Sequence, residues 1–205
     1  MKKSFLILLP LFLLSGCASY RVRPLPELSI SGAHSPFVHN NAVNFAYRVF
    51  DRSDCKKYLD RDVISKGYQP IHLTIVNSSN RSVAFSRRNL SLETVDSYVV
   101  ADTVQTNTVG RVFGYGAAAL IMWPFVIPAI VDGVGSAKAN ERLAMDFLGK
   151  SLQDQVIEPN ESINGLVFVP IELFKSSFKV TLSDIETSKR IVLASGQHNS
   201  AVQSL

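Results

Sequence analysis

The chain has 205 residues, and its 46% hydrophobic content suits a folded domain and excludes an intrinsically disordered chain. The net charge of +4 falls to +2 without Lys2 and Lys3, and the basic pairs at 56–57 and 87–88 are isolated, which we interpret as solvated surface charge. No basic stripe interleaved with aromatic residues is present, so the composition excludes nucleic acid as an expected partner. Two cysteines exclude a disulfide-rich scaffold.

The N-terminus divides into a positive segment, an apolar run and a short motif. Lys2 and Lys3 precede the uncharged run Phe5–Leu14, which has the length of a signal-peptide core. A helix that spans a bilayer needs about 20 apolar residues, so this run is too short to be a permanent anchor. The run ends in Leu14–Cys17, with the sequence Leu-Ser-Gly-Cys. These features resemble the N-termini of bacterial lipoproteins, whose lipobox ends in the cysteine that receives the lipid.

The resemblance implies a diacylglycerol thioether on Cys17, cleavage between Gly16 and Cys17, and acylation of the new amino group. Several acyl chains anchor a protein firmly, at about 0.8 kcal/mol per buried CH₂. Ala18 follows the cysteine where aspartate would retain a lipoprotein at the inner membrane. The resemblance therefore implies a lipid-anchored protein of the cell membrane, in the outer membrane if the organism is Gram-negative. We expect a signal peptide over residues 1–16 and a lipidated N-terminus with an extended tether over 17–38.

Short segments of alternating apolar residues follow, and this period-two pattern is typical of half-buried strands. The strands that it predicts are 43–49, 71–75, 83–85, 90–95, 166–169, 178–182 and 191–193. A short helix capped by Ser53 and ended by Gly67 is expected between the first two. About seven short strands favour a mainly β fold, which we interpret as an immunoglobulin-like β-sandwich over residues 39–205. This domain resembles no particular family.

An apolar helical insertion over residues 110–154 interrupts the predicted sandwich. Its first part, 112–131, contains no charged residue. A glycine-containing turn at 132–135 and a helix from Ser136 to about Gln153 are expected to follow, with apolar side chains on one face of that helix. The two parts together predict a helical hairpin.

Three interpretations of residues 112–131 remain open. A membrane-spanning helix fits the length, but it would contain Pro124 and Pro128 and would separate the two groups of strands across the membrane. Alternatively, the segment 110–132 touches the anchoring membrane or an envelope partner protein. The third interpretation is a helix buried against the sandwich itself. The second interpretation assigns the contacts to Trp123, Phe125, Ile127 and Ile130.

Residues typical of catalysis or metal binding form no recognisable pattern. The four histidines show no His-Glu-x-x-His spacing, and Gly133–Ser136 lacks the features of a phosphate-binding loop. With Cys17 committed to lipid, Cys55 is single and is expected to be buried. We therefore expect no metal, no cofactor and no catalytic residue, and a non-enzymatic binding or structural role at the cell envelope. The alternatives are an envelope hydrolase whose catalytic residues converge only in three dimensions, and an oligomeric component that contacts membrane through 110–132.

Overall fold

A computed structural model of the chain describes residues 20–28, 37–40, 43–105 and 126–195. The chain divides into two compact units. Unit 1 consists of residues 1–22 and 105–146, and unit 2 consists of residues 23–104 and 147–205. The strands all belong to unit 2, and most of the long helix belongs to unit 1.

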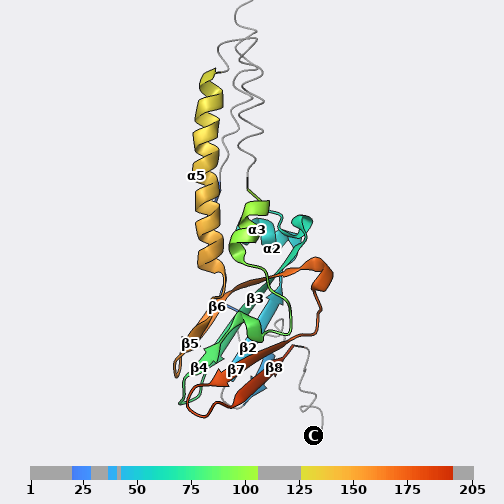
Figure 1. Cartoon of the computed structure of the whole chain (residues 1–205), viewed down its shortest axis with the longest axis vertical. Helices are drawn as coiled ribbons and strands as arrows, with labels where there is room; N and C mark the ends of the chain where they lie inside the picture. The colour runs from blue at the N-terminus through green and yellow to red at the C-terminus, as the bar shows by residue number, and fades with distance from the viewer. Residues whose placement is uncertain (1–19, 29–36, 41–42, 106–125, 196–205) are drawn as a thin grey trace, which may run out of the picture. The chain divides into compact units, whose positions relative to one another are not determined.

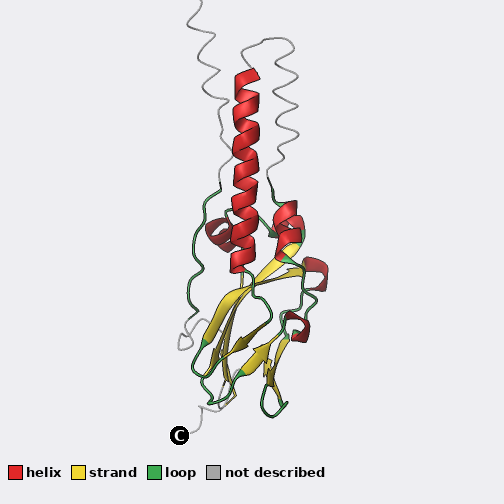
Figure 2. Cartoon of the chain, turned by 60° about the vertical axis from the view of Figure 1, so that its left-hand side comes forward, coloured by secondary structure: helices red, strands yellow, loops and turns green. Residues whose placement is uncertain are grey.

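Two antiparallel sheets of four strands each form unit 2. Figures 1 and 2 show how these sheets are arranged in unit 2. Sheet A has the order β1-β2-β3-β6 and consists of β1 (Phe37–Asn40), β2 (Val43–Val49), β3 (Tyr68–Asn77) and β6 (Ser162–Pro170). Sheet B has the order β5-β4-β7-β8 and consists of β5 (Gln155–Ile157), β4 (Val83–Phe85), β7 (Lys179–Asp184) and β8 (Arg190–Ala194). The mainly β class predicted from the alternating pattern is therefore confirmed.

The two sheets share one apolar core, which the alternation of each strand builds. In β3, the side chains of Ile71, Leu73 and Ile75 point to one face of sheet A and have no exposed surface. Val180 and Leu182 of β7 do the same from sheet B. Each such side chain contributes about 1.5–3 kcal/mol when it is fully buried.

Part of the other face of sheet A is covered as well. His72, Leu166 and Phe168 point away from the core between the sheets, yet all three are fully buried. The ring of Phe147 stacks on Phe168 with centroids 5.7 Å apart, and Phe50 meets His72 edge-on at 5.8 Å. The β3–β6 pair is therefore buried on both faces around His72 and Leu166, whereas Asn164 on the same outer face is exposed.

The helix predicted between the first two strands is present in a shorter form. It consists of α2 (Arg52–Asp54), the π-helical turn η1 (Cys55–Leu59) and the 3-10 turn η2 (Ile64–Lys66). The cap is Asp51 and not Ser53, because Asp51 and Asp54 form a capping box in which each carboxylate accepts the other's backbone N–H. Gly67 ends η2 with φ 90°, as predicted.

The strand predicted over 90–95 is wrong. The 3-10 turn η3 (Arg87–Asn89) follows β4, and the chain then bridges to β7 at Leu90 and to β6 at Val95. Because its two ends pair with strands of different sheets, this segment cannot run along either sheet. The helix α3 (Ser97–Thr103), which the sequence analysis did not predict, follows and is capped by Asp96.

A single helix, α5 (Val126–Lys150), occupies the second half of the predicted insertion. The predicted turn at 132–135 is wrong, because the helix continues through both glycines at a cost of about 1 kcal/mol each. Pro128 lies in the first turn, where a missing N–H removes no intrahelical hydrogen bond. The helix ends at Lys150, and the first arm of the predicted hairpin lies outside the described residues.

A close approach at Gly165 in β6 provides a test of this packing. A Cβ at Gly165 would lie 2.8 Å from the carbonyl oxygen of Lys150 and 2.9 Å from Cγ of Leu152. We expect Gly165→Ala to lower the free energy of unfolding by about 1–3 kcal/mol, measured by urea denaturation. Gly149→Ala is the control, because its Cβ would meet no atom within 4 Å and alanine favours the helix. Equal losses in both variants would contradict the described contact.

Candidate functional site

Most of the predicted site residues lie outside the described residues: Gly16, Cys17, Trp123 and Phe125. Ile127 and Ile130 lie in the first turns of α5, and their side chains are outside the described part as well. In the part of the chain that the structure describes, no helix has both the length and the apolar character to cross a bilayer. The contact predicted for 110–132 therefore stays a prediction.

A polar cluster lies on the outer face of sheet A, with His72 and Thr74 buried and Asn164 exposed. Register pairs Thr74 of β3 with Asn164 of β6. The Oδ1 atom of Asn164 accepts from the Thr74 hydroxyl at 2.8 Å and lies 2.6 Å from Nε2 of His72. Since an amide oxygen only accepts, His72 carries its proton on Nε2. Its Nδ1 atom is then a buried acceptor that has no hydrogen-bond partner among the described residues.

The electrostatics of this cluster favour a neutral imidazole. Burial lowers the pKa of His72 below its ordinary value of 6.5 and outweighs the hydrogen bond from His72 to Asn164, which raises it. The ring is closed to solvent, and no group of three or more metal-ligating side chains occurs among the described residues. We interpret the cluster as the polar pairing that holds β3 and β6 in register.

A second buried group surrounds Cys55. Asp54, which precedes it, accepts two bonds from the guanidinium of Arg48, at 2.6 and 3.1 Å. Burial, followed by the negative charges of Asp62 and Asp54, raises the pKa of the Cys55 thiol to about 12. The reactive form of cysteine is the thiolate, so this buried thiol is inert at neutral pH, and the predicted burial is confirmed.

An open pocket of about 350 Å³ lies on the outer face of sheet B, the face that is turned to solvent. Its floor is β7, where Lys179, Thr181 and Ser183 alternate with the core residues Val180 and Leu182 and therefore share the outer face. The complete lining is Arg88, Asn89, Leu90, Ser91, Lys179, Thr181, Ser183 and Arg190. We call it the sheet B pocket.

The turn η3 forms one wall of the sheet B pocket and is fixed at both ends. At its start, the carboxylate of Asp154 accepts from the Ser86 hydroxyl and from the backbone N–H of Arg87, each at 2.8 Å. These bonds, that from Arg87 first, lower the pKa of Asp154, so the carboxylate is ionised at neutral pH. After η3, Ser91 donates its N–H to Lys179 O and accepts the Lys179 N–H on its hydroxyl. These hydrogen bonds hold the segment that carries Arg88 at both of its ends.

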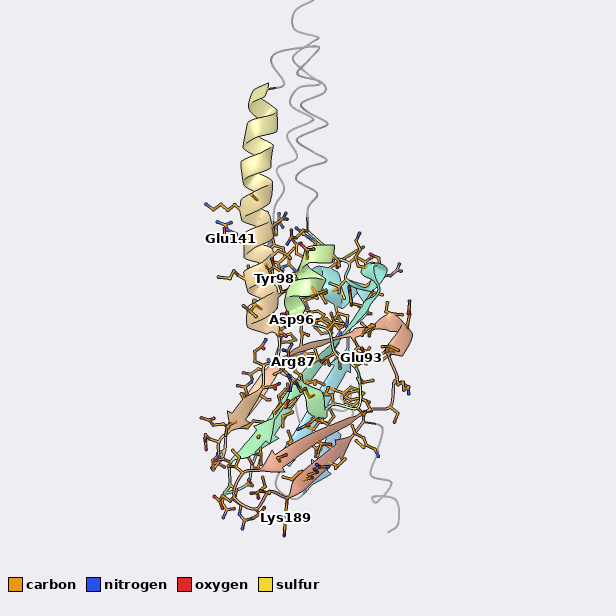
Figure 3. All side chains as sticks on the ribbon, in the orientation of Figure 1. Arg87, Glu93, Asp96, Tyr98, Glu141 and Lys189 are labelled. Carbon is orange, nitrogen blue, oxygen red and sulfur yellow. The ribbon has the colours of Figure 1, made fainter. Side chains whose placement is uncertain are left out.

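A neighbouring pocket of about 300 Å³ shares Arg88 with the sheet B pocket but has a different charge. It is also lined by Arg87, Thr94, Asp96 and Asp154. Arg87 and Asp96 form an ion pair at 3.6 Å, and Figure 3 shows both near η3. Acidic and basic groups balance in this pocket, whereas the sheet B pocket has three basic side chains and no acidic one in its lining.

Unit 1 has a shallow groove of its own, of about 480 Å³, along α5. The groove mixes apolar, acidic and basic groups: Val22, Lys138, Glu141, Arg142, Met145 and Asp146. The hydroxyl of Tyr20 donates to the carboxylate of Asp146. Because the charges alternate in sign, the groove favours no particular ligand class.

The sheet B pocket was not predicted from the sequence, in which Arg87 and Arg88 form an isolated pair of basic residues. The alternation of Lys179, Thr181 and Ser183 is the signal that predicts a polar strand face. Comparison with known proteins finds no matching family, no matching curated protein and no matching solved structure. Function is therefore inferred from the N-terminal motif and from the groups that line the cavities.

The pH dependence of stability tests the environment of His72. Because the folded-state pKa lies below 6.5, acidification below pH 6.5 protonates the unfolded chain first and lowers the free energy of unfolding. The loss is at most about 1.4 kcal/mol per pH unit, down to the folded pKa. We expect His72→Gln to lose less stability than the wild type between pH 7.5 and 5, measured by urea denaturation. Parallel pH profiles of stability for the wild type and His72→Gln would contradict the lowered pKa of His72.

Proposed function

We propose that the protein is a lipid-anchored lipoprotein of the bacterial cell envelope, and that unit 2 is a non-enzymatic binding module. The N-terminal motif supports the anchor, with cleavage after Gly16 and lipid on Cys17. Ala18 supports the outer membrane as the destination in a Gram-negative organism. The envelope is also where a partner protein would be met.

The sheet B pocket is the observation that carries the binding role. It opens on the solvent-facing side of sheet B, and its lining consists mainly of cationic and hydroxyl side chains. Such groups bind and orient a ligand, but arginine cannot act as a general base, because it stays protonated in proteins. The one buried imidazole of unit 2 that the structure describes, His72, is closed to solvent and bonded to an amide. These features support binding over the hydrolase alternative.

The finer architecture belongs to the same proposal. The shared core of two four-stranded antiparallel sheets supports an immunoglobulin-like sandwich. The uncharged run 112–131 and the length of α5 support a helical hairpin. We propose that the segment 110–132 touches the anchoring membrane, with an envelope partner or the protein's own surface as the alternatives. This segment would let the protein serve as an oligomeric envelope component.

The lipid anchor is tested by labelling cells with radioactive palmitate. The wild type and Cys55→Ser should be labelled, whereas Cys17→Ala should not, because the thioether forms only at Cys17. Cys55→Ser is the matched control, since the chain has two cysteines. Mass spectrometry of the wild type should place the mature N-terminus at Cys17. Equal labelling of Cys17→Ala would overturn the anchor.

Trp123 is the single tryptophan of the chain and reports on the segment 110–132. In vesicles that contain brominated phosphatidylcholine, we expect the fluorescence of Trp123 to be quenched, because bromine atoms on the acyl chains would touch the indole ring. Trp123→Phe gives the background signal. Blue-shifted emission without quenching would place the ring inside protein and would contradict the membrane contact.

A further inference from the structure

Three basic side chains from distant parts of the sequence converge on the sheet B pocket. Lys179 lies at the start of β7, and Arg190 at the start of β8 lies opposite Ser183 in the register. The bridge between Leu90 and Val180 brings the chain after η3 alongside β7, and so places Arg88 at the pocket. Their convergence is a product of the fold, since Arg88 and Lys179 are far apart in the sequence.

In the part of unit 2 that the structure describes, the three cations lack the carboxylate partners that four arginines have. Arg48, Arg61, Arg81 and Arg87 each form an ion pair with a carboxylate. Within the described ranges, Arg88, Lys179 and Arg190 form no ion pair at 4.0 Å or less. Asp154 acts on Arg88 electrostatically, but its oxygens are held by the start of η3. Like charges gathered in one pocket repel one another, and a bound anion relieves that repulsion.

The other lining groups indicate which anion fits. Ser91, Thr181 and Ser183 bring hydroxyl donors beside the cations. A phosphate group has several oxygens in a tetrahedral arrangement and can accept from hydroxyls and guanidinium groups together, with arginine able to donate two parallel bonds. A volume of about 350 Å³ lies at the lower end of the range for small-molecule sites. These features favour a small phosphate ester over a macromolecule.

We propose that the sheet B pocket binds a phosphate ester, free or as the exposed headgroup of a lipid, through Arg88, Lys179 and Arg190. This inference rests on the binding role proposed above, for which it names the ligand class. It does not depend on the lipid anchor, because the pocket lies wholly within unit 2. The neighbouring pocket, whose carboxylates repel anions, is not part of the site.

The test is a calorimetric titration of the full-length protein in non-ionic detergent. One arm uses glycerol 3-phosphate in solution, and the other uses detergent micelles that contain phosphatidic acid. We expect Arg88→Gln and Arg190→Gln each to weaken binding about tenfold, as expected for loss of a charge-assisted hydrogen bond. Lys189→Gln is the matched control, because it removes one exposed charge from the same β7–β8 hairpin but does not line the pocket (Figure 3).

The outcomes separate the hypotheses. Binding of glycerol 3-phosphate with this pattern of variants supports a free ester, and the same pattern with phosphatidic acid alone supports a lipid headgroup. An equal loss in Lys189→Gln would show that net charge alone acts, and would overturn the site. Absence of binding in both arms would also overturn it. Arg88→Lys, which keeps the charge, should bind more tightly than Arg88→Gln and guards against loss of fold. Failure of palmitate labelling would overturn the anchor and leave this result unchanged.

Discussion

Burial of the β3–β6 pair on both faces, around His72 and Leu166, is the constraint on which the rest of unit 2 depends. One face packs against sheet B through the shared apolar core, and the other packs against the rings of Phe50 and Phe147. Among the residues that the structure describes, no such second layer covers the outer face of β7, so this face is open to solvent. Polar side chains on the covered part of sheet A are therefore buried, whereas those on the outer face of sheet B are accessible to ligands.

Polar groups on the covered face of sheet A must be paired within the protein, because an unpaired buried group costs about 1–3 kcal/mol. Oδ1 of the exposed Asn164 accepts from the buried Thr74 hydroxyl and from one of the two ring nitrogens of His72. The same demand applies where α5 ends: the ammonium group of Lys150 is buried and donates to the carbonyl oxygen of Tyr58 at 2.6 Å. Polar side chains such as those of His72 and Lys150 are thus part of the interior.

Alternation predicted most strands because it reports which residues face the common core. It predicted 71–75 from Ile71, Leu73 and Ile75, but it could not show that the residues between them are covered as well, because burial of that face depends on other segments. The prediction of a strand over 90–95 was wrong for a related reason, because alternation cannot distinguish a strand from a segment that crosses between two sheets. Only half of the sheet B pocket could be predicted, because the alternating residues of β7 indicate a polar strand face. The position of Arg88 could not, since the turn that carries it is held by Asp154, which lies far along the chain. The turn predicted at the glycines of α5 was wrong because the local preference of glycine is weak against a long helix.

The buried thiol of Cys55 makes the folded protein a poor participant in disulfide exchange. A pKa of about 12 leaves almost no thiolate at neutral pH, and burial keeps oxidants and other thiols from the sulfur atom. An unfolded copy has neither protection, because its thiol regains the ordinary pKa and meets solvent. Covalent trapping of this cysteine therefore counts molecules that have opened, so the chain carries its own chemical reporter of the folded fraction.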